Sequence, residues 1–357
     1  MLVKDIKYSL KDIMIVPAKI SEINSRKECN PRDRWGYLPI ISAPMYGILN
    51  QDNWETFNKN GIHSMLPRYR EEDWDSYDEY MDQIQQGVWA AISIKDFENW
   101  FCNENKLIGQ ELACYNICID TANGHMKRIY HLCDEAKQLA KDYNYELNIM
   151  VGNIANPETL EYCWNYKGEL IVDYVRLGIG GGVCCTTTSS TSIHYPMASL
   201  IDECRQFLNH KYFTQVNLGN TDTHYQLPKL VADGGIRGIS DIIRCLALGS
   251  DYVMLGTVLA KTKESCAESF ANANGELVKL FYGMSTPFAQ KYYKEGENRR
   301  TEGRRIEVKT EYAIEEFVNE FEDYMRSAMS YCNARTLQEF KPNCVIISPT
   351  TQELQKR

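Results

Sequence analysis

The chain lacks several features that mark whole classes of protein. No apolar run approaches the roughly 18 residues that a membrane-spanning helix needs, and Met1 to Lys7 hold no apolar core of a signal peptide. Internal repeats, low-complexity tracts and interdomain linkers are also missing. A net charge of −9 argues against a general polyanion-binding surface. These absences predict a cytoplasmic protein that binds neither membranes nor nucleic acids.

The thirteen cysteines show none of the paired spacing of a secreted disulfide scaffold. Cys184 and Cys185 are adjacent, and no C-x-x-C pair exists. This pattern favours a reducing compartment. Because 44% of the 357 residues are hydrophobic and 24% charged, we expect a globular protein with a sizeable core.

Short apolar runs recur along the chain and are mostly continuous rather than alternating, as in parallel strands buried on both faces. The eight runs are residues 38–43, 62–66, 88–94, 113–119, 147–151, 173–177, 229–232 and 251–255. Helix-like segments separate them, among them residues 73–86, 126–143 and 239–248. This alternation predicts an α/β protein, a (β/α)₈ TIM barrel.

We expect a single domain over residues 1–357. Its parts are an N-terminal arm (1–37), the barrel (38–262), a flap-like insertion after the eighth strand (about 264–312), closing helices (313–341) and a tail (342–357). The insertion is polar and is predicted to be irregular. Segments this long are usually functional, often as lids.

Polar residues and glycines gather where the predicted strands end, which is the active face of such barrels. They are Asp120–Gly124, Gly152–Asn153, Gly178–Thr188, Asp233–Gly235 and Gly256–Thr257. The last two loops occupy the usual phosphate position of the fold, where glycine amides and the Thr257 hydroxyl can donate to phosphate oxygens.

The Gly178–Thr188 loop is the most informative of these segments. Its glycines let the backbone bend sharply toward a ligand. A thiol on a strand-end loop is a candidate nucleophile when the cysteine spacing of the chain does not indicate disulfide bonds. Taken alone, the same loop also fits a structural turn around a buried cysteine.

Motifs spread over nearly the whole chain carry a resemblance. They are Tyr8–Pro17, Ile41–Met45, Gly152–Asn153, Gly178–Thr187, Ala232–Ile236, Val253–Gly256, Phe281–Ser285 and Arg299–Gly303. In this order they resemble the IMP dehydrogenase/GMP reductase family of purine nucleotide barrels.

Three features resemble the reductase branch. Only residues 67–87 separate the second and third strands, too few for the regulatory domain that dehydrogenases usually carry there. Glu302 precedes Gly303, where dehydrogenases have glutamine. Asn24–Arg26 is similar to the reductase segment that reaches a neighbouring subunit's NADPH.

The resemblance implies NADPH-dependent reductive deamination of GMP to IMP and ammonia. Attack by a thiolate divides this reaction into two easier steps through a covalent thioimidate. Cys185 aligns with the family nucleophile, whereas Cys184 occupies an apolar position. Thr187 and Glu302 match the pair that protonates the leaving amine. Without the resemblance, Glu302 would be taken for a solvated charge.

The resemblance also implies binding residues. For the substrate they are Asp233, Gly234, Gly235, Gly256, Thr257, Tyr282, Gly283, Met284, Ser285, Arg299 and Gly303. For the cofactor they are Ser25, Arg26, Asp120, Thr121, Ala122, Ile179, Gly180, Met284, Asn298, Arg299, Ser327 and Ser330. A potassium ion would be held by backbone carbonyls of Gly180, Gly182 and Cys185. The family further implies a homotetramer with the cofactor's adenosine end bound across a subunit boundary.

Three residues depart from the family pattern close to the nucleotide. Val183 replaces a serine that contacts the phosphate, Tyr46 replaces an aspartate, and Thr188 replaces an arginine beside the cation loop. Two alternatives therefore stay open. One is an IMP dehydrogenase or a reductase of a related purine (deoxy)nucleotide, and the other is a non-catalytic nucleotide-binding paralogue.

Overall fold

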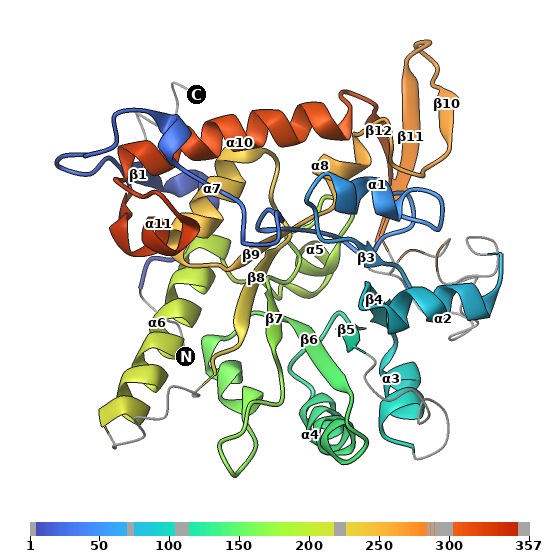
Figure 1. The fold of residues 1–357 in the computed structure, drawn as a ribbon. Coiled ribbons are helices and arrows are strands. Elements are labelled where there is room, and N and C mark those ends of the chain that lie inside the picture. Colours follow the sequence, from blue (N-terminus) through green and yellow to red (C-terminus); the bar gives the residue numbers. More distant parts are fainter. Residues whose placement is uncertain are drawn as a thin grey trace.

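The computed structural model describes residues 5–69, 75–103, 114–217, 226–283, 286, 289 and 303–348. Eight parallel strands form one sheet in the order β2-β9-β8-β7-β6-β5-β4-β3 (Figure 1). A parallel bridge between Ile41 and His63 brings its two edges together. The strands are β2 (Ile40–Ser42), β3 (Met65–Leu66), β4 (Trp89–Ile92), β5 (Cys114–Asp120), β6 (Glu146–Ile154), β7 (Tyr174–Leu177), β8 (Lys229–Asp233) and β9 (Tyr252–Leu255). The predicted barrel is confirmed.

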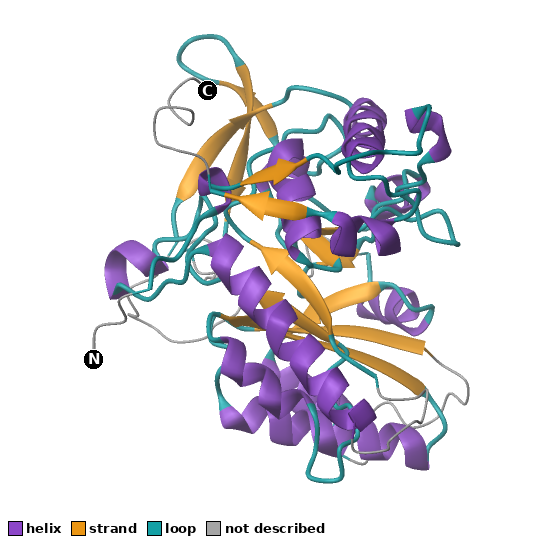
Figure 2. Cartoon of the chain, turned by 90° about the vertical axis from the view of Figure 1, so that its left-hand side faces the viewer, coloured by secondary structure: helices purple, strands orange, loops and turns teal. Residues whose placement is uncertain are grey.

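Helices surround the sheet (Figure 2). They include α1 (Trp54–Lys59), α2 (Tyr77–Gln85), α3 (Ile94–Phe101), α4 (Lys127–Asp142), α5 (Thr187–Thr191), α6 (Met197–Asn217), α7 (Ile239–Leu248) and α8 (Thr257–Ala260). The 3₁₀ helix η3 (Pro157–Cys163) stands between β6 and β7. Two C-terminal helices follow, α10 (Ile314–Tyr331) and α11 (Leu337–Asn343).

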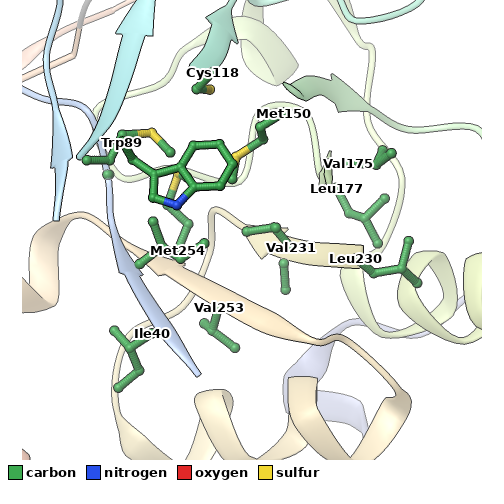
Figure 3. Packing of buried hydrophobic residues seen from close by; sticks show 14 of the residues in the cluster. Ile40, Trp89, Cys118, Met150, Val175, Leu177, Leu230, Val231, Val253 and Met254 are labelled. Carbon is green, nitrogen blue, oxygen red and sulfur yellow. The ribbon is translucent and has the colours of Figure 1, made fainter. Parts of the chain in front are cut away.

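Aromatic rings fill the barrel toward the start of the strands. The ring centroid of Trp89 lies 4.9 Å from that of Tyr174, which lies 5.8 Å from that of Tyr252. Trp89 also points toward Met150 and Met254 (Figure 3). Because side chains alternate along a strand, Arg176 faces the same interior as Tyr174, one layer nearer the mouth.

The insertion after the barrel is not irregular in its described part, which corrects the sequence-based expectation. Strands β10 (Ser269–Ala271), β11 (Leu277–Tyr282) and β12 (Arg305–Lys309) form an antiparallel sheet that projects beyond the barrel (Figure 1). Lys279 anchors it. Its side chain is buried, and its Nζ donates to the carbonyls of Thr262, Lys263 and Ser265 at 2.8–3.1 Å. These strands were not predicted because the composition of the segment is polar.

The N-terminal arm packs on its own chain. Strand β1 (Met14–Val16) pairs antiparallel with β13 (Val345–Ile347). Further along, Arg32 forms an ion pair with Glu322 of α10, and the Asn30 amide donates to the Arg335 carbonyl at 2.8 Å. Across the described residues, the helices are all too short or too polar to cross a membrane.

Candidate functional site

A cavity of about 370 Å³ opens where the barrel strands end. Residues after β2, β3, β5, β7, β8 and β9 line it together with Asn153 near the end of β6, so that strand ends far apart in sequence meet at one place. This position at the carboxyl ends of the strands is where catalysis occurs in barrels of this type. The flap contributes Phe281, Gly283 and Gly303 to its wall.

The loop after β7 places a thiol and a hydroxyl side by side in this cavity. The half-buried Cys185 thiol donates to Thr187 Oγ1 at 3.2 Å. The Cys185 amide donates to the Gly182 carbonyl at 3.0 Å, which closes a turn and fixes the cysteine relative to the glycines. Thr187 begins α5. The arrangement can hold a nucleophile beside a group that relays a proton.

Cys184 has a different environment from its neighbour. Its side chain is buried, and its Sγ lies 3.8 Å from the Phe281 carbonyl oxygen. Burial raises the pKa of the Cys184 thiol to about 11. Cys184 is buried, whereas Cys185 is half-buried and contacts the Thr187 hydroxyl, so the geometry favours Cys185 as the candidate nucleophile.

The flap returns to the loop after β7. Gly303 forms an antiparallel bridge with Cys185, and the Arg304 amide donates to the Cys184 carbonyl at 2.9 Å. The Arg304 Nε donates to the Val183 carbonyl at 3.1 Å. Glu302, the predicted acid, directly precedes Gly303 in the chain but lies outside the described residues.

Gly180 is a position that requires glycine. Its φ of +75° lies in the left-handed region, and a Cβ there would come within 1.8 Å of Thr188 Oγ1. Thr188 also donates its hydroxyl to the Ile193 carbonyl at 3.3 Å. The residue that departs from the family pattern therefore packs directly on the glycine loop.

The two predicted phosphate loops line the cavity as a pair. Gly234 and Gly235 follow β8, while Gly256 follows β9 and Thr257 begins α8. Val183 lines the same cavity and brings no hydroxyl to it. Glycine backbone and the Thr257 hydroxyl thus line this part of the cavity, a composition that suits an anionic group.

A buried arginine that the sequence reasoning missed holds two carboxylates at the floor of the cavity. Arg176 Nη2 lies 2.8 Å from Asp233 Oδ2, and its Nη1 lies 3.3 Å from Asp120 Oδ1. The Arg176 side chain is only 9% exposed. Burial by itself lowers the pKa of Arg176. The two carboxylates outweigh this effect and raise the pKa of Arg176 above its usual range. An arginine inside an otherwise apolar strand indicates such a partner in advance.

Two further contacts extend this network. Asn153 Nδ2 donates to Asp233 Oδ2 and to the Gly178 carbonyl, both at 2.8 Å. On the other side, Arg68 Nη2 donates to the Asp120 carbonyl at 2.6 Å. Arg68, which follows β3 and was also missed, lines the cavity. Ends of strands β3, β5, β6, β7 and β8 are thereby tied together by charge and hydrogen bonds.

Most predicted substrate residues meet in this cavity. Its lining includes Asp233, Gly234, Gly235, Gly256, Thr257, Gly283 and Gly303. Tyr282 is buried at the end of β11, packed with Tyr46 and Ala289, and does not line it. Met284, Ser285 and Arg299 lie outside the described residues.

The predicted cofactor residues fall into two groups. Asp120, Thr121, Ala122, Ile179 and Gly180 line the cavity. Ser25, Arg26, Ser327 and Ser330 do not line it, and lie where the arm meets α10. There the Ser21 hydroxyl donates to the Ser330 carbonyl at 2.7 Å, and Arg26 lies 4.0 Å from Asp323. Met284, Asn298 and Arg299 belong to the undescribed part.

The predicted cation loop stays a prediction. Its donors would be backbone carbonyls, of which that of Gly182 already accepts the Cys185 amide. Side-chain metal sites are a separate matter: no three His, Cys, Asp or Glu side chains gather into a metal-binding group within the described ranges.

Comparison with known proteins agrees with this geometry. The model of the IMP dehydrogenase / GMP reductase domain matches residues 8–356. GMP reductase 1 of Mus musculus is 28% identical over 363 residues, which cover 98% of this chain and 96% of the relative. GMP reductase 1 of Homo sapiens and GMP reductase of Buchnera aphidicola are each 28% identical with the same coverage. The chain belongs to the IMP dehydrogenase / GMP reductase family.

Proposed function

We propose that this protein is an enzyme that reductively deaminates GMP to IMP and ammonia, with NADPH as the reductant. The observation that carries the proposal is the Cys185 thiol, 3.2 Å from the Thr187 hydroxyl at a cavity walled by glycine loops. Similarity to GMP reductases over 98% of the chain supports the same activity. Loss of NADPH absorbance with GMP as substrate, and release of ammonia in equal amount, test it.

In the proposed reaction, the Cys185 sulfur forms a bond to the purine C2 and the C2–amino bond breaks. The leaving nitrogen needs a proton, which Glu302 supplies through the Thr187 hydroxyl. NADPH, when bound, supplies the hydride that reduces C2. Release of the Cys185 thiol then returns the enzyme to its starting state. Thr187 is suited to the relay because its hydroxyl already contacts the nucleophile.

Replacing Glu302 with glutamine is expected to slow ammonia release by about 100-fold, because an amide cannot donate the proton that the amine needs. Single-turnover ammonia release measures this step. Glu307→Gln, an exposed change on β12, is the matched control and leaves the rate unchanged. Equal rates for Glu302→Gln and the native protein would remove Glu302 from the mechanism.

The residues that would hold the cofactor have the chemical properties that a dinucleotide needs. Thr121, Ala122, Ile179 and Gly180 offer the cavity an uncharged wall with backbone groups, which suits a nicotinamide ring. Arg26 is a more than half-exposed cation on the arm, which suits a 2′-phosphate. Since the arm residues do not line the cavity of their own chain, we propose that a homotetramer brings them to a neighbour's cofactor.

Arg26→Ala is expected to raise the KM for NADPH about tenfold or more, as for loss of a charged hydrogen bond worth about 1.5–3 kcal/mol. The KM for NADH, which lacks the 2′-phosphate, should not change and is the internal control. Steady-state kinetics with both cofactors and light scattering of the native protein make the test. A fully active monomer, or parallel changes for both cofactors, would contradict the proposed arm.

The phosphate loops predict that guanosine binds far more weakly than GMP. Because Val183 leaves one donor out of this site, Val183→Ser is expected to tighten GMP by about 0.5–1.5 kcal/mol. Guanosine affinity should not respond to this change. Calorimetry of both ligands with both proteins measures the difference, and equal affinity for nucleotide and nucleoside would place the phosphate elsewhere.

Val183 and Tyr46 also favour a second candidate, a reductase of a related purine (deoxy)nucleotide. The buried Tyr46 donates its hydroxyl to the Arg68 carbonyl at 2.9 Å, so an aromatic side chain stands where the family has aspartate. A panel of purine ribo- and deoxyribonucleotides, each assayed with NADPH, decides between the two candidates. A kcat/KM higher for another nucleotide than for GMP would select the second.

A further inference from the structure

Two cysteines outside the proposed active site face each other at the C-terminal end of the fold. Cys332 follows α10 and Cys344 follows α11, and their Sγ atoms are 3.7 Å apart. Cys332 is buried, whereas Cys344 is half-buried. Neither lines the cavity described above. The end of α10, α11 and β1 lie together in Figure 1.

The residues on either side of Cys332 hold the N-terminal arm. The Tyr331 carbonyl accepts the Ala18 amide at 2.9 Å, and Asn333 Oδ1 accepts the Glu22 amide at 2.9 Å. Two residues further, the Arg335 carbonyl accepts the Asn30 amide at 2.8 Å. The second half of the arm is thus attached to the segment that contains Cys332.

Cys344 lies next to the second attachment of the N-terminal arm. It directly precedes β13, whose Val345 pairs with Val16 and whose Ile347 pairs with Met14. The first half of the arm therefore depends on where the chain leaves Cys344. A covalent bond between the two sulfurs would tie both attachments of the arm to each other.

We propose that Cys332 and Cys344 are an oxidation site, at which a hydroperoxide forms a disulfide that clamps the base of the N-terminal arm. To bond, the sulfurs must approach from 3.7 Å to about 2.05 Å. The inference rests on these contacts and does not depend on the proposed function.

The chemistry balances with a hydroperoxide as the only oxidant. The thiol of Cys344 donates to Cys332, which lowers the pKa of Cys332 and favours its thiolate. That thiolate attacks the terminal peroxide oxygen: an S–O bond forms, the O–O bond breaks, and hydroxide leaves from hydrogen peroxide or an alkoxide from an organic hydroperoxide. The Cys344 sulfur then attacks the sulfenic sulfur, the S–O bond breaks, and water leaves. The two sulfurs lose two electrons and the peroxide gains them.

Hydrogen peroxide titration followed by non-reducing peptide mapping tests the site. We expect a Cys332–Cys344 cross-link at a dose that leaves Cys102 and Cys114 as thiols, since burial is the main cause that raises the pKa of Cys114 to about 11 and of Cys102 to about 12. In Cys344→Ser, the serine hydroxyl still donates to Cys332, so Cys332 should gain one oxygen and form no cross-link. Oxidation of Cys102 and Cys114 at the same dose, without the cross-link, would overturn the proposal.

Hydrogen exchange tests the clamp. In the oxidised protein the Ala18, Glu22 and Asn30 amides should exchange several-fold more slowly, because opening the arm would no longer separate its two attachments. Peroxide-treated Cys332→Ser is the control and should show no slowing. A complete cross-link with unchanged exchange of these amides would overturn the clamp. Activity is not the readout, because the half-buried Cys185 is itself open to peroxide.

Discussion

Cys185→Ala should lower turnover by roughly 10⁴-fold or more, the scale seen when a covalent nucleophile is removed. The reason is that the purine C2 is a poor electrophile, and without the sulfur both the departure of ammonia and the reduction must occur in one step. Loss of NADPH absorbance measures turnover. Intact mass of the protein mixed with GMP alone should show a nucleotide adduct in the native chain and none in the variant.

Cys184→Ala is the matched control for this change. It removes a neighbouring sulfur that is buried against Phe281 and lies on the same loop. Turnover should stay within a few-fold of native, and calorimetry should give native GMP affinity for both variants. An inactive Cys184→Ala beside an active Cys185→Ala would reverse the assignment of the nucleophile.

Arg176→Met should destabilise the fold by about 3–5 kcal/mol, as expected when one partner of a buried ion pair is removed. The variant leaves Asp120 and Asp233 with side chains only 14% and 16% exposed and without their shared cation. Methionine keeps much of the side-chain volume, so the loss is one of charge rather than of packing. Denaturant unfolding monitored by tryptophan fluorescence gives the free energy of unfolding.

Two comparisons separate charge from general damage. Lys261→Met breaks the more exposed Lys261–Glu311 pair and should cost about 0–1 kcal/mol. Adding Asp233→Asn to Arg176→Met removes the carboxylate that lay closest to the lost guanidinium and should recover part of the lost stability, whereas Asp120 keeps its ion pair with Arg68. If Arg176→Met lowered the free energy of unfolding no more than Lys261→Met does, the buried network would contribute no more to stability than an exposed ion pair.

How far the fold could be predicted differs from element to element. The eight strands were predictable because continuous apolar runs are the direct consequence of burial on both faces of a parallel sheet. Helix α4 was predictable from its apolar spacing, whereas α3 and α6 did not stand out. Strands β10 to β12 were missed because charged residues such as Lys279, Glu307 and Lys309 interrupt their apolar residues and give the segment a polar composition.

Some parts of the candidate site could likewise be predicted from the sequence and others could not. Strand-end glycines and Cys185 stand close together in sequence, so the loop after β7 could be assigned a nucleophile from its residues and the resemblance. The sequence by itself determined the barrel and the end of it at which polar residues and glycines gather, whereas the prediction of Cys185 as the nucleophile also needed the family resemblance. Only the tertiary structure decided that Arg176 joins Asp120 to Asp233, that the arm rests on residues 330–336 of its own chain, and that Cys332 meets Cys344. Each of these pairs side chains from separate elements, and the distance between such elements is set by packing of the whole chain, which no local pattern of residues encodes.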